Sequence, residues 1–108
     1  IINKSKQEII IIDNYADKKL LDILTKTKKQ ITLYTKNTSE ELIKKYQTQY
    51  NNLTIIKKDN LHDRFIIIDK KILYHSGASF KDLGKNCFAI NEVEDKTILE
   101  NLLTYLEK

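Results

Sequence analysis

The segment HDRFIIID, residues 62–69, determines how the middle of the chain folds. Its centre, Arg64 to Ile68, is an apolar run of mostly β-branched residues, which predicts a buried strand. A second apolar run, Ile72 to Tyr74, follows after only the three residues 69–71, which is a hairpin spacing. We therefore expect the chain to turn back on itself here as an antiparallel pair.

Strands and helices alternate before this hairpin. Three short apolar runs predict strands: residues 8–13, 31–34 and 53–56. Two helices are predicted between them: residues 18–26, capped by Asp17, and a second that starts at Thr38 or Ser39 with Glu40 and Glu41 in its first turn. A β-α-β-α-β order favours a mainly parallel sheet with right-handed connections.

The last third of the chain adds a strand over residues 88–93 and a helix capped by Asp95. That helix carries an apolar stripe of five residues: Ile98, Leu99, Leu102, Leu103 and Leu106. The stripe predicts either a core face or part of a dimer contact, and the pattern is the same for both. Together the elements predict an α/β fold, with a mixed β-sheet flanked by helices, in one domain over residues 1–108.

Composition narrows the class of protein. With 41% hydrophobic and 31% charged residues over 108 positions, the chain has the composition of a folded domain. Its longest unbroken apolar run, residues 9–12, is far too short for a transmembrane helix. Cys87, the single cysteine, cannot form an internal disulfide and has no second ligand beside it, so we expect a cytoplasmic location and neither metal nor cofactor. The chain begins with Ile1, and we expect it to be a domain of a longer protein.

The formal net charge of +4 favours an anionic partner only weakly, because the lysines are spread along the chain. Arg64 is the single arginine among 19 basic residues, and its planar fork of donors suits a phosphate better than a lysine does. Both histidines, both glycines and the cysteine also fall between positions 62 and 87. This window is where we expect chemistry.

His62 and Arg64 are two residues apart, at the start of the predicted strand. Side chains at positions i and i+2 of a strand point to the same face about 6.5–7 Å apart, so both can reach one phosphate-sized anion. The imidazole can be a nucleophile or a proton carrier, while the guanidinium holds an oxyanion. After the hairpin, the small residues SGAS, from Ser76 and Gly77 to Ser79, predict a turn that brings backbone N–H groups and hydroxyls to the same anion.

These residues resemble the phospholipase D superfamily. His62-x-Arg64-x4-Asp69 has the spacing of the family's HxKxxxxD motif, and Ser76 to Ser79 fall at the offset of its small-residue turn. The order of the elements also suits one phospholipase D-like repeat. Residues 62–84 are further similar to C-terminal domains of some phage-type regulatory proteins.

The resemblance implies a fold and a mechanism. In active members a histidine attacks phosphorus without a metal, and single-motif members form homodimers to bring two motifs together. For this chain it implies that His62 is the nucleophile in one protomer and the general acid in the other. Arg64 would clamp the phosphate, Ser79 would occupy the family's asparagine position, and Asp69 would stabilise the end of the strand. No membrane span and no cofactor is implied.

The chain departs from the family pattern at three places. Arg64 replaces lysine, Ser79 replaces asparagine, and Lys85 and Asn86 stand where a carboxylate would orient the histidine. We therefore favour a degenerate or weakly active phosphate site that acts on or binds nucleic acid. Two alternatives stay open: an active homodimeric, metal-independent phosphodiesterase or nuclease, and an architectural dimerisation domain. The other histidine, His75, matches no motif position and predicts a structural role.

Overall fold

A computed structural model describes residues 8–14, 18–26, 28–59, 64–76 and 90–107. In chain order its elements are β1 (Glu8–Ile12), α1 (Lys18–Leu24), β2 (Gln30–Thr35), α2 (Glu40–Gln49), β3 (Leu53–Lys57), β4 (Arg64–Ile68), β5 (Ile72–Ser76), β6 (Ile90–Val93) and α3 (Lys96–Leu106). The strands form one mixed sheet in the order β3-β2-β1-β4-β5-β6. The predicted α/β fold, a mixed sheet flanked by helices, is confirmed.

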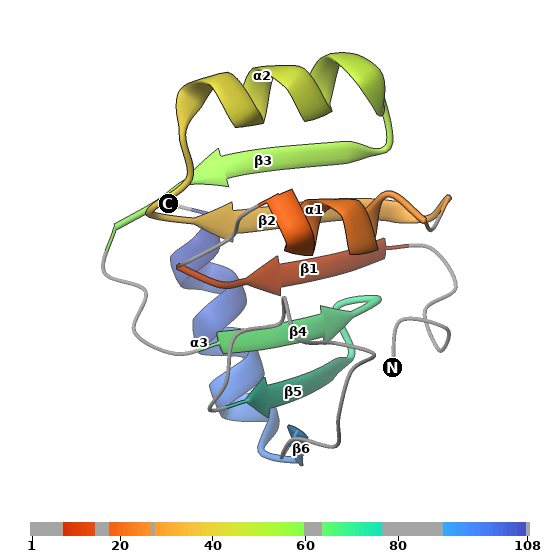
Figure 1. Cartoon of the computed structure of the whole chain (residues 1–108). Helices are drawn as coiled ribbons and strands as arrows, with labels where there is room; N and C mark the ends of the chain where they lie inside the picture. The colour runs from red at the N-terminus through yellow and green to blue at the C-terminus, as the bar shows by residue number, and fades with distance from the viewer. Residues whose placement is uncertain (1–7, 15–17, 27, 60–63, 77–89, 108) are drawn as a thin grey trace.

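The sheet has a parallel half and an antiparallel half. Strands β1, β2 and β3 pair in parallel, whereas β4 pairs antiparallel with β1 and with β5, and β6 pairs antiparallel with β5. Four strands therefore end at one edge of the sheet, where β4 begins, and Figure 1 shows their arrowheads pointing the same way. We call this edge the carboxyl edge, and the opposite one, which holds the β4–β5 hairpin, the turn edge.

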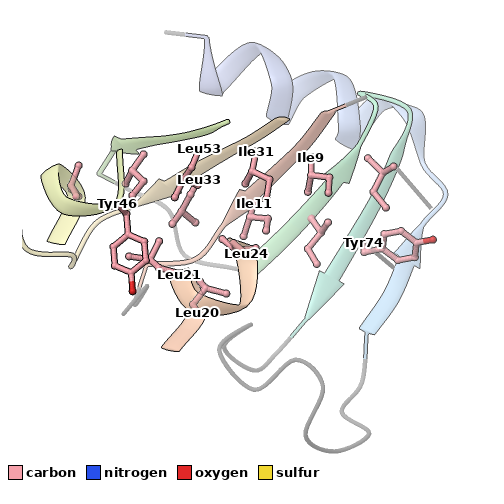
Figure 2. Packing of buried hydrophobic residues seen from close by; sticks show 14 residues of the cluster. Ile9, Ile11, Leu20, Leu21, Leu24, Ile31, Leu33, Tyr46, Leu53 and Tyr74 are labelled. Carbon is pink, nitrogen blue, oxygen red and sulfur yellow. The ribbon is translucent and has the colours of Figure 1, made fainter. Parts of the chain in front are cut away.

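Each face of the sheet has its own apolar core. On one face, β1 residues such as Ile9 and Ile11 pack against α1, through Leu20, Leu21 and Leu24 (Figure 2). Helix α2 contributes its buried residues to the same cluster. On the other face, α3 buries Leu99 and Leu106 against the alternate residues of β1, β4 and β5. The central strand β1 is thus covered on both sides, which explains why four isoleucines in a row suit it.

The helix ends agree with the sequence in part. Ser39, not Thr38, caps α2, because its Oγ accepts a hydrogen bond from the Leu42 N–H (3.2 Å). Asp95 caps α3 by accepting from the Thr97 N–H (2.9 Å), as predicted. The first helix was predicted to reach Lys26 but ends at Leu24, and its Asp17 cap lies outside the described residues.

Two further predictions on the fold were wrong in detail. Ile98 is 45% exposed, although it was assigned to the apolar stripe of α3. It precedes the buried Leu99, and one residue turns a helix by about 100°, so its side chain leaves the core face. Ser76 was placed in a turn, but it is the last residue of β5 and the pairing partner of Arg64. The strand is longer than its apolar run, since the pairing with β4 continues through His75.

Strand β3 forms one outer edge of the sheet. The Ile55 N–H donates to the side-chain oxygen Oε1 of Gln47, on α2, at 2.8 Å. This contact satisfies a backbone donor of the edge strand with a side chain from the helix that precedes it. Among the described residues, no helix is long and apolar enough to cross a bilayer.

Candidate functional site

Polar residues stand side by side along the carboxyl edge of the sheet. Lys57 pairs with Thr35 in the register of β3 and β2. Asp13 follows β1 and donates its N–H to the Tyr34 carbonyl (3.1 Å), which places it next to Thr35. Because Ile12 pairs with Phe65, Asp13 also lies opposite Arg64 at the start of β4. We call Lys57, Thr35, Asp13 and Arg64 the polar row.

The polar row lies on the face of the sheet that α1 and α2 cover. Side chains alternate along a strand, and Asp13 is two residues beyond Ile11, while Arg64 is two residues before Ile66. Both isoleucines belong to the core cluster under α1 and α2. The polar row therefore lies on the same face as this apolar core, at its outer end, where polar and charged side chains follow the apolar ones.

Asp13 and Arg64 form the ion pair at the centre of this row. The Asp13 side chain is completely buried, the Arg64 side chain is 26% exposed, and Arg64 Nε lies 3.7 Å from Asp13 Oδ1. A buried carboxylate is costly unless a cation or hydrogen-bond donors accompany it. The pair thus holds the guanidinium in place at the edge while about a quarter of the side chain reaches solvent.

The loops that follow β1 and β2 are tied to each other. The Asn37 N–H donates to the Asn14 carbonyl (2.9 Å), and the hydroxyls of Thr35 and Thr38 lie 3.1 Å apart. Both threonines are buried. The backbone beside the ion pair is therefore fixed by hydrogen bonds within the described residues.

A basic hollow opens at the same edge, beside β2 and β3. It has a volume of about 300 Å³ and is lined by Lys36, Lys57, Lys58 and Asp59. We call it the basic hollow. Since Lys57 belongs both to this hollow and to the polar row, the two features are continuous.

A second hollow, of about 360 Å³, lies at the turn edge. It is lined by residues of the β4–β5 hairpin and of α3: Lys70, Lys71, Lys96, Leu99, Glu100 and Leu103. It is the larger of the two, but it lies at the opposite end of the strands from Arg64. We place the candidate site at the carboxyl edge because the ion pair, the motif arginine and the basic hollow meet there.

Three of the six predicted site residues, Arg64, Asp69 and Ser76, are among the described residues. Arg64 is at the carboxyl edge, and Ser76 is its register partner in the neighbouring strand β5. His62, Gly77 and Ser79 lie outside the described residues.

Asp69 is at the far end of β4, on the turn edge. Its carboxylate Oδ1 accepts from the Glu8 N–H (2.9 Å), and its own N–H donates to the Glu8 carbonyl (2.9 Å). The two ends of the motif are thus separated by the whole length of the strand, and Asp69 binds backbone at the start of β1.

His75 lies one residue before Ser76 and points to the other face of the sheet, toward α3. Its ring is 5.2 Å from that of Phe65, centroid to centroid, in a tilted arrangement. Phe65 belongs to the core cluster under α3. This is a packing contact between two rings, and His75 lies on the opposite face of the sheet from the polar row.

Asp13 is the residue of the candidate site that the sequence did not reveal. No carboxylate was predicted to accompany Arg64, and Asp13 was assigned only to the end of the first predicted strand. The available signal was the position of Asp13, directly after a strand that is apolar on both faces. Such a residue lies at the carboxyl edge, and it meets Arg64 because β1 and β4 are antiparallel neighbours.

The described residues hold no group of three or more histidine, cysteine, aspartate or glutamate side chains placed to bind a metal ion. The chemistry at the carboxyl edge comes from one guanidinium, several ammonium groups, hydroxyls and a buried carboxylate. These groups can hold an anion through charge-assisted hydrogen bonds.

The mixed sheet, with α1 and α2 on one face and α3 on the other, is consistent with the phospholipase D-like fold. No family model and no curated protein matches the sequence. Among solved structures, the chain is similar to NucT from Helicobacter pylori. The TM-score is 0.67 at 15% sequence identity, over 98% of this chain and 80% of that one.

The chain is also similar to TrmBL2, an archaeal chromatin protein whose structure shows a novel mode of DNA binding. The TM-score is 0.55 at 14% identity, over 96% of this chain. This chain spans 44% of the TrmBL2 chain. At these identities both similarities show the fold.

Proposed function

We propose that the carboxyl edge binds a phosphate of a nucleic acid, with Arg64 as the central cation. The proposal is carried by one observation: the chain's only arginine is fixed at this edge by a fully buried aspartate 3.7 Å away and keeps a quarter of its side chain exposed. A guanidinium that is already held in position loses little conformational freedom when it binds a phosphate.

Further support comes from the surroundings and from the fold. The lysines of the basic hollow add positive charge beside Arg64, and Ser76, the register partner of Arg64, begins the small-residue segment of the motif. Gly77 and Ser79 complete that segment and are proposed phosphate ligands on the motif resemblance. One of the proteins with a similar fold, TrmBL2, binds DNA.

The same ion pair favours a binding site, degenerate or weakly active, over an efficient catalyst. Phosphoryl transfer needs positive charge that is not already compensated, because negative charge accumulates on the phosphoryl oxygens. Asp13 offsets part of the charge of Arg64. We therefore propose that binding exceeds turnover at this site.

The motif itself favours a second candidate, a homodimeric metal-independent phosphodiesterase or nuclease. In that mechanism His62 would attack phosphorus and form a P–N bond as the P–O bond to the leaving group breaks. His62 of the partner subunit would give its proton to the leaving oxygen, and water would then hydrolyse the phosphohistidine. The third candidate, an architectural dimerisation domain, needs no ligand at this edge.

Binding can be tested by fluorescence anisotropy with a labelled 15-nucleotide single strand over a salt series. We expect salt-dependent binding that Arg64→Ala abolishes and that Arg64→Lys retains in part, since lysine keeps the charge but not the fork. The matched control is Lys44→Ala, which removes one exposed charge from α2. Equal affinity of the folded Arg64→Ala variant and the unchanged chain would contradict the proposal.

Cleavage of the same strand separates the candidates. Product that forms in EDTA and disappears in His62→Ala supports the phosphodiesterase, with light scattering to establish whether the chain is a dimer. Binding without product supports the degenerate site. A dimer that neither binds nor cleaves supports the architectural role.

A further inference from the structure

The basic hollow extends the candidate site beyond the reach of Arg64. Lys57 and Arg64 are separated by two strands of the polar row, β2 and β1. Neighbouring strands lie about 4.8 Å apart, so three steps across the sheet give about 14 Å. One phosphate cannot contact both ends of this distance, whereas a chain of phosphates can.

The lysines of the hollow are held by contacts on both faces of the sheet. Lys57 Nζ lies 3.0 Å from Glu40 Oε1, at the start of α2. Lys58 Nζ lies 4.7 Å from the centroid of the Tyr105 ring on α3. Because α2 and α3 cover opposite faces, the two lysines flank the edge from opposite sides.

Tyr105 also fixes the backbone of the hollow. Its hydroxyl donates to the Asp59 carbonyl (3.0 Å), and the Lys58 N–H donates to the Thr35 carbonyl (3.0 Å). Figure 1 shows the C-terminal end of α3 close to the ends of β2 and β3, in agreement with these contacts. These two hydrogen bonds hold the backbone around Lys58 and Asp59 in place.

From this arrangement we propose that the basic hollow is a second phosphate subsite, and that the ligand is a nucleic-acid strand of several nucleotides lying along the carboxyl edge from Arg64 to Lys58. The inference rests on the proposed function of Arg64 and adds the class of ligand: a polymer, not a mononucleotide or a small phosphodiester. Lys36, exposed at the end of β2, would contact the same phosphate as Lys58.

The test compares two ligand lengths on the 108-residue chain. Anisotropy is measured with a labelled 15-nucleotide single strand and with a labelled dinucleotide, for the unchanged chain and for Lys36→Ala/Lys58→Ala. We expect the double variant to bind the 15-mer about 10-fold more weakly at low salt, with a salt slope reduced by about 0.7 for each phosphate that the variant no longer neutralises. Dinucleotide binding, which needs only the Arg64 subsite, should stay within twofold.

The control is Lys44→Ala/Lys71→Ala, which removes the same charge from α2 and from the turn edge. It should leave both the affinity for the 15-mer and the salt slope unchanged. The single variant Lys36→Ala keeps the Lys58–Tyr105 contact and should weaken binding of the 15-mer less than the double variant does, because Lys58 still contacts the phosphate.

The outcomes distinguish the two proposals. If Arg64→Ala abolishes binding but Lys36→Ala/Lys58→Ala behaves like its control, the second subsite is wrong and the Arg64 site stands. If both double variants weaken binding equally, the lysines act only through net charge, and the subsite is also wrong. If Arg64→Ala binds both ligands as the unchanged chain does, the proposed function fails, and the second subsite fails with it.

Discussion

Arg64 and Asp69, two charged residues of the motif, lie at opposite ends of strand β4. Their side chains have different kinds of partner. At the turn edge, Asp69 exchanges two hydrogen bonds of 2.9 Å with the backbone of Glu8. At the carboxyl edge, Arg64 faces a carboxylate instead, with Nε 3.7 Å from a fully buried Asp13 and part of its side chain in solvent. One end is bound to the framework of the sheet, and the other presents a positioned cation.

The difference separates a charge bound to the backbone from a charge that we propose to bind a ligand, within five residues of sequence. The two hydrogen bonds between Asp69 and the Glu8 backbone stabilise the fold at the turn edge. A guanidinium carries several N–H donors in a fixed fork, and that of Arg64 is partly exposed. Arg64 and Asp69 match the same motif, but the structure gives them unlike surroundings.

The largest expected effect on stability comes from Arg64→Ala. Without the guanidinium, the fully buried Asp13 loses its cation, and we expect the free energy of unfolding to fall by about 3 kcal/mol. Urea unfolding measures the change. The double variant Asp13→Asn/Arg64→Ala should recover part of the loss, because an amide carries no charge into the core. A loss below about 1 kcal/mol would contradict the importance of the pair.

At the other end of β4, Asp69→Ala should cost about 1–2 kcal/mol. The variant loses the acceptor for the Glu8 N–H, and it places alanine at a φ of 52°, where aspartate and asparagine are better tolerated. Asp69→Asn is the control. Its free energy of unfolding should lie within about 0.5 kcal/mol of that of the unchanged chain, since asparagine keeps a hydrogen-bond acceptor and also tolerates a positive φ. A folded Asp69→Asn variant with impaired nucleic-acid binding would remove the distinction between the two ends.

A smaller gain is expected next to Asp69, in the hairpin turn. Lys70 has a φ of 56°, and the Lys71 N–H donates to the Ile68 carbonyl (2.9 Å) across the turn. Positive φ at both central positions is typical of type I′ turns, which favour Asn-Gly. Lys70→Gly should therefore raise the free energy of unfolding by about 0.5 kcal/mol, because loss of the steric strain of a positive φ outweighs the added entropy of the unfolded state. Urea unfolding measures the change. Lys71→Gly, outside the central pair, should give no gain.

The smallest effect concerns a third carboxylate, Asp22, whose side chain is 48% exposed. A hydrogen bond from the Tyr46 hydroxyl, and then one from Lys18, lowers the pKa of Asp22 from its ordinary 3.8. The same contact raises the pKa of Tyr46 to about 12. The stability from Asp22 is present above pH 3.8 and is lost as the pH falls through the lowered pKa. That from Tyr46 is present below pH 10 and is lost as the pH rises toward 12.

Urea unfolding of the unchanged chain and of Tyr46→Phe at pH 2.5, 4 and 7 tests the acid side of this prediction. The difference in stability between the two should shrink at the lowest pH. The conversion of Tyr50, which stacks on Tyr46, to phenylalanine is the control and should not alter the acid dependence. A difference that stays constant down to pH 2.5 would show that the Asp22 carboxylate does not contribute.

Local patterns predicted much of the fold. The isoleucine run of β1, the acidic first turn of α2 and the Asp95 cap of α3 are each visible within about ten residues of sequence, and each is found in the structure. The ends of elements were less predictable, because they depend on tertiary pairing. Ser76 was assigned to a turn, yet it extends β5 because β4 lies beside it.

Of the residues in the candidate site, only the one that belongs to the motif was predictable from the sequence. Arg64 was identified because it is the single arginine and stands at the motif spacing. Asp13 is 51 positions earlier, and it meets Arg64 only through the strand order β2-β1-β4. A sequence read along its length contains no local signal for a pairing between strands so far apart. The basic hollow has the same origin, since its lysines follow two different strands and rest on two different helices.

The Gln47 side chain on the Ile55 N–H has a consequence for how two copies of this chain can associate. A neighbouring molecule that extended the sheet at β3 would have to displace this amide before its own backbone could bond there. Growth into a continuous intermolecular sheet is thereby discouraged at this margin, as is the fibrous aggregation that begins from uncovered strands. Pairing of two copies of the chain through this margin is therefore disfavoured.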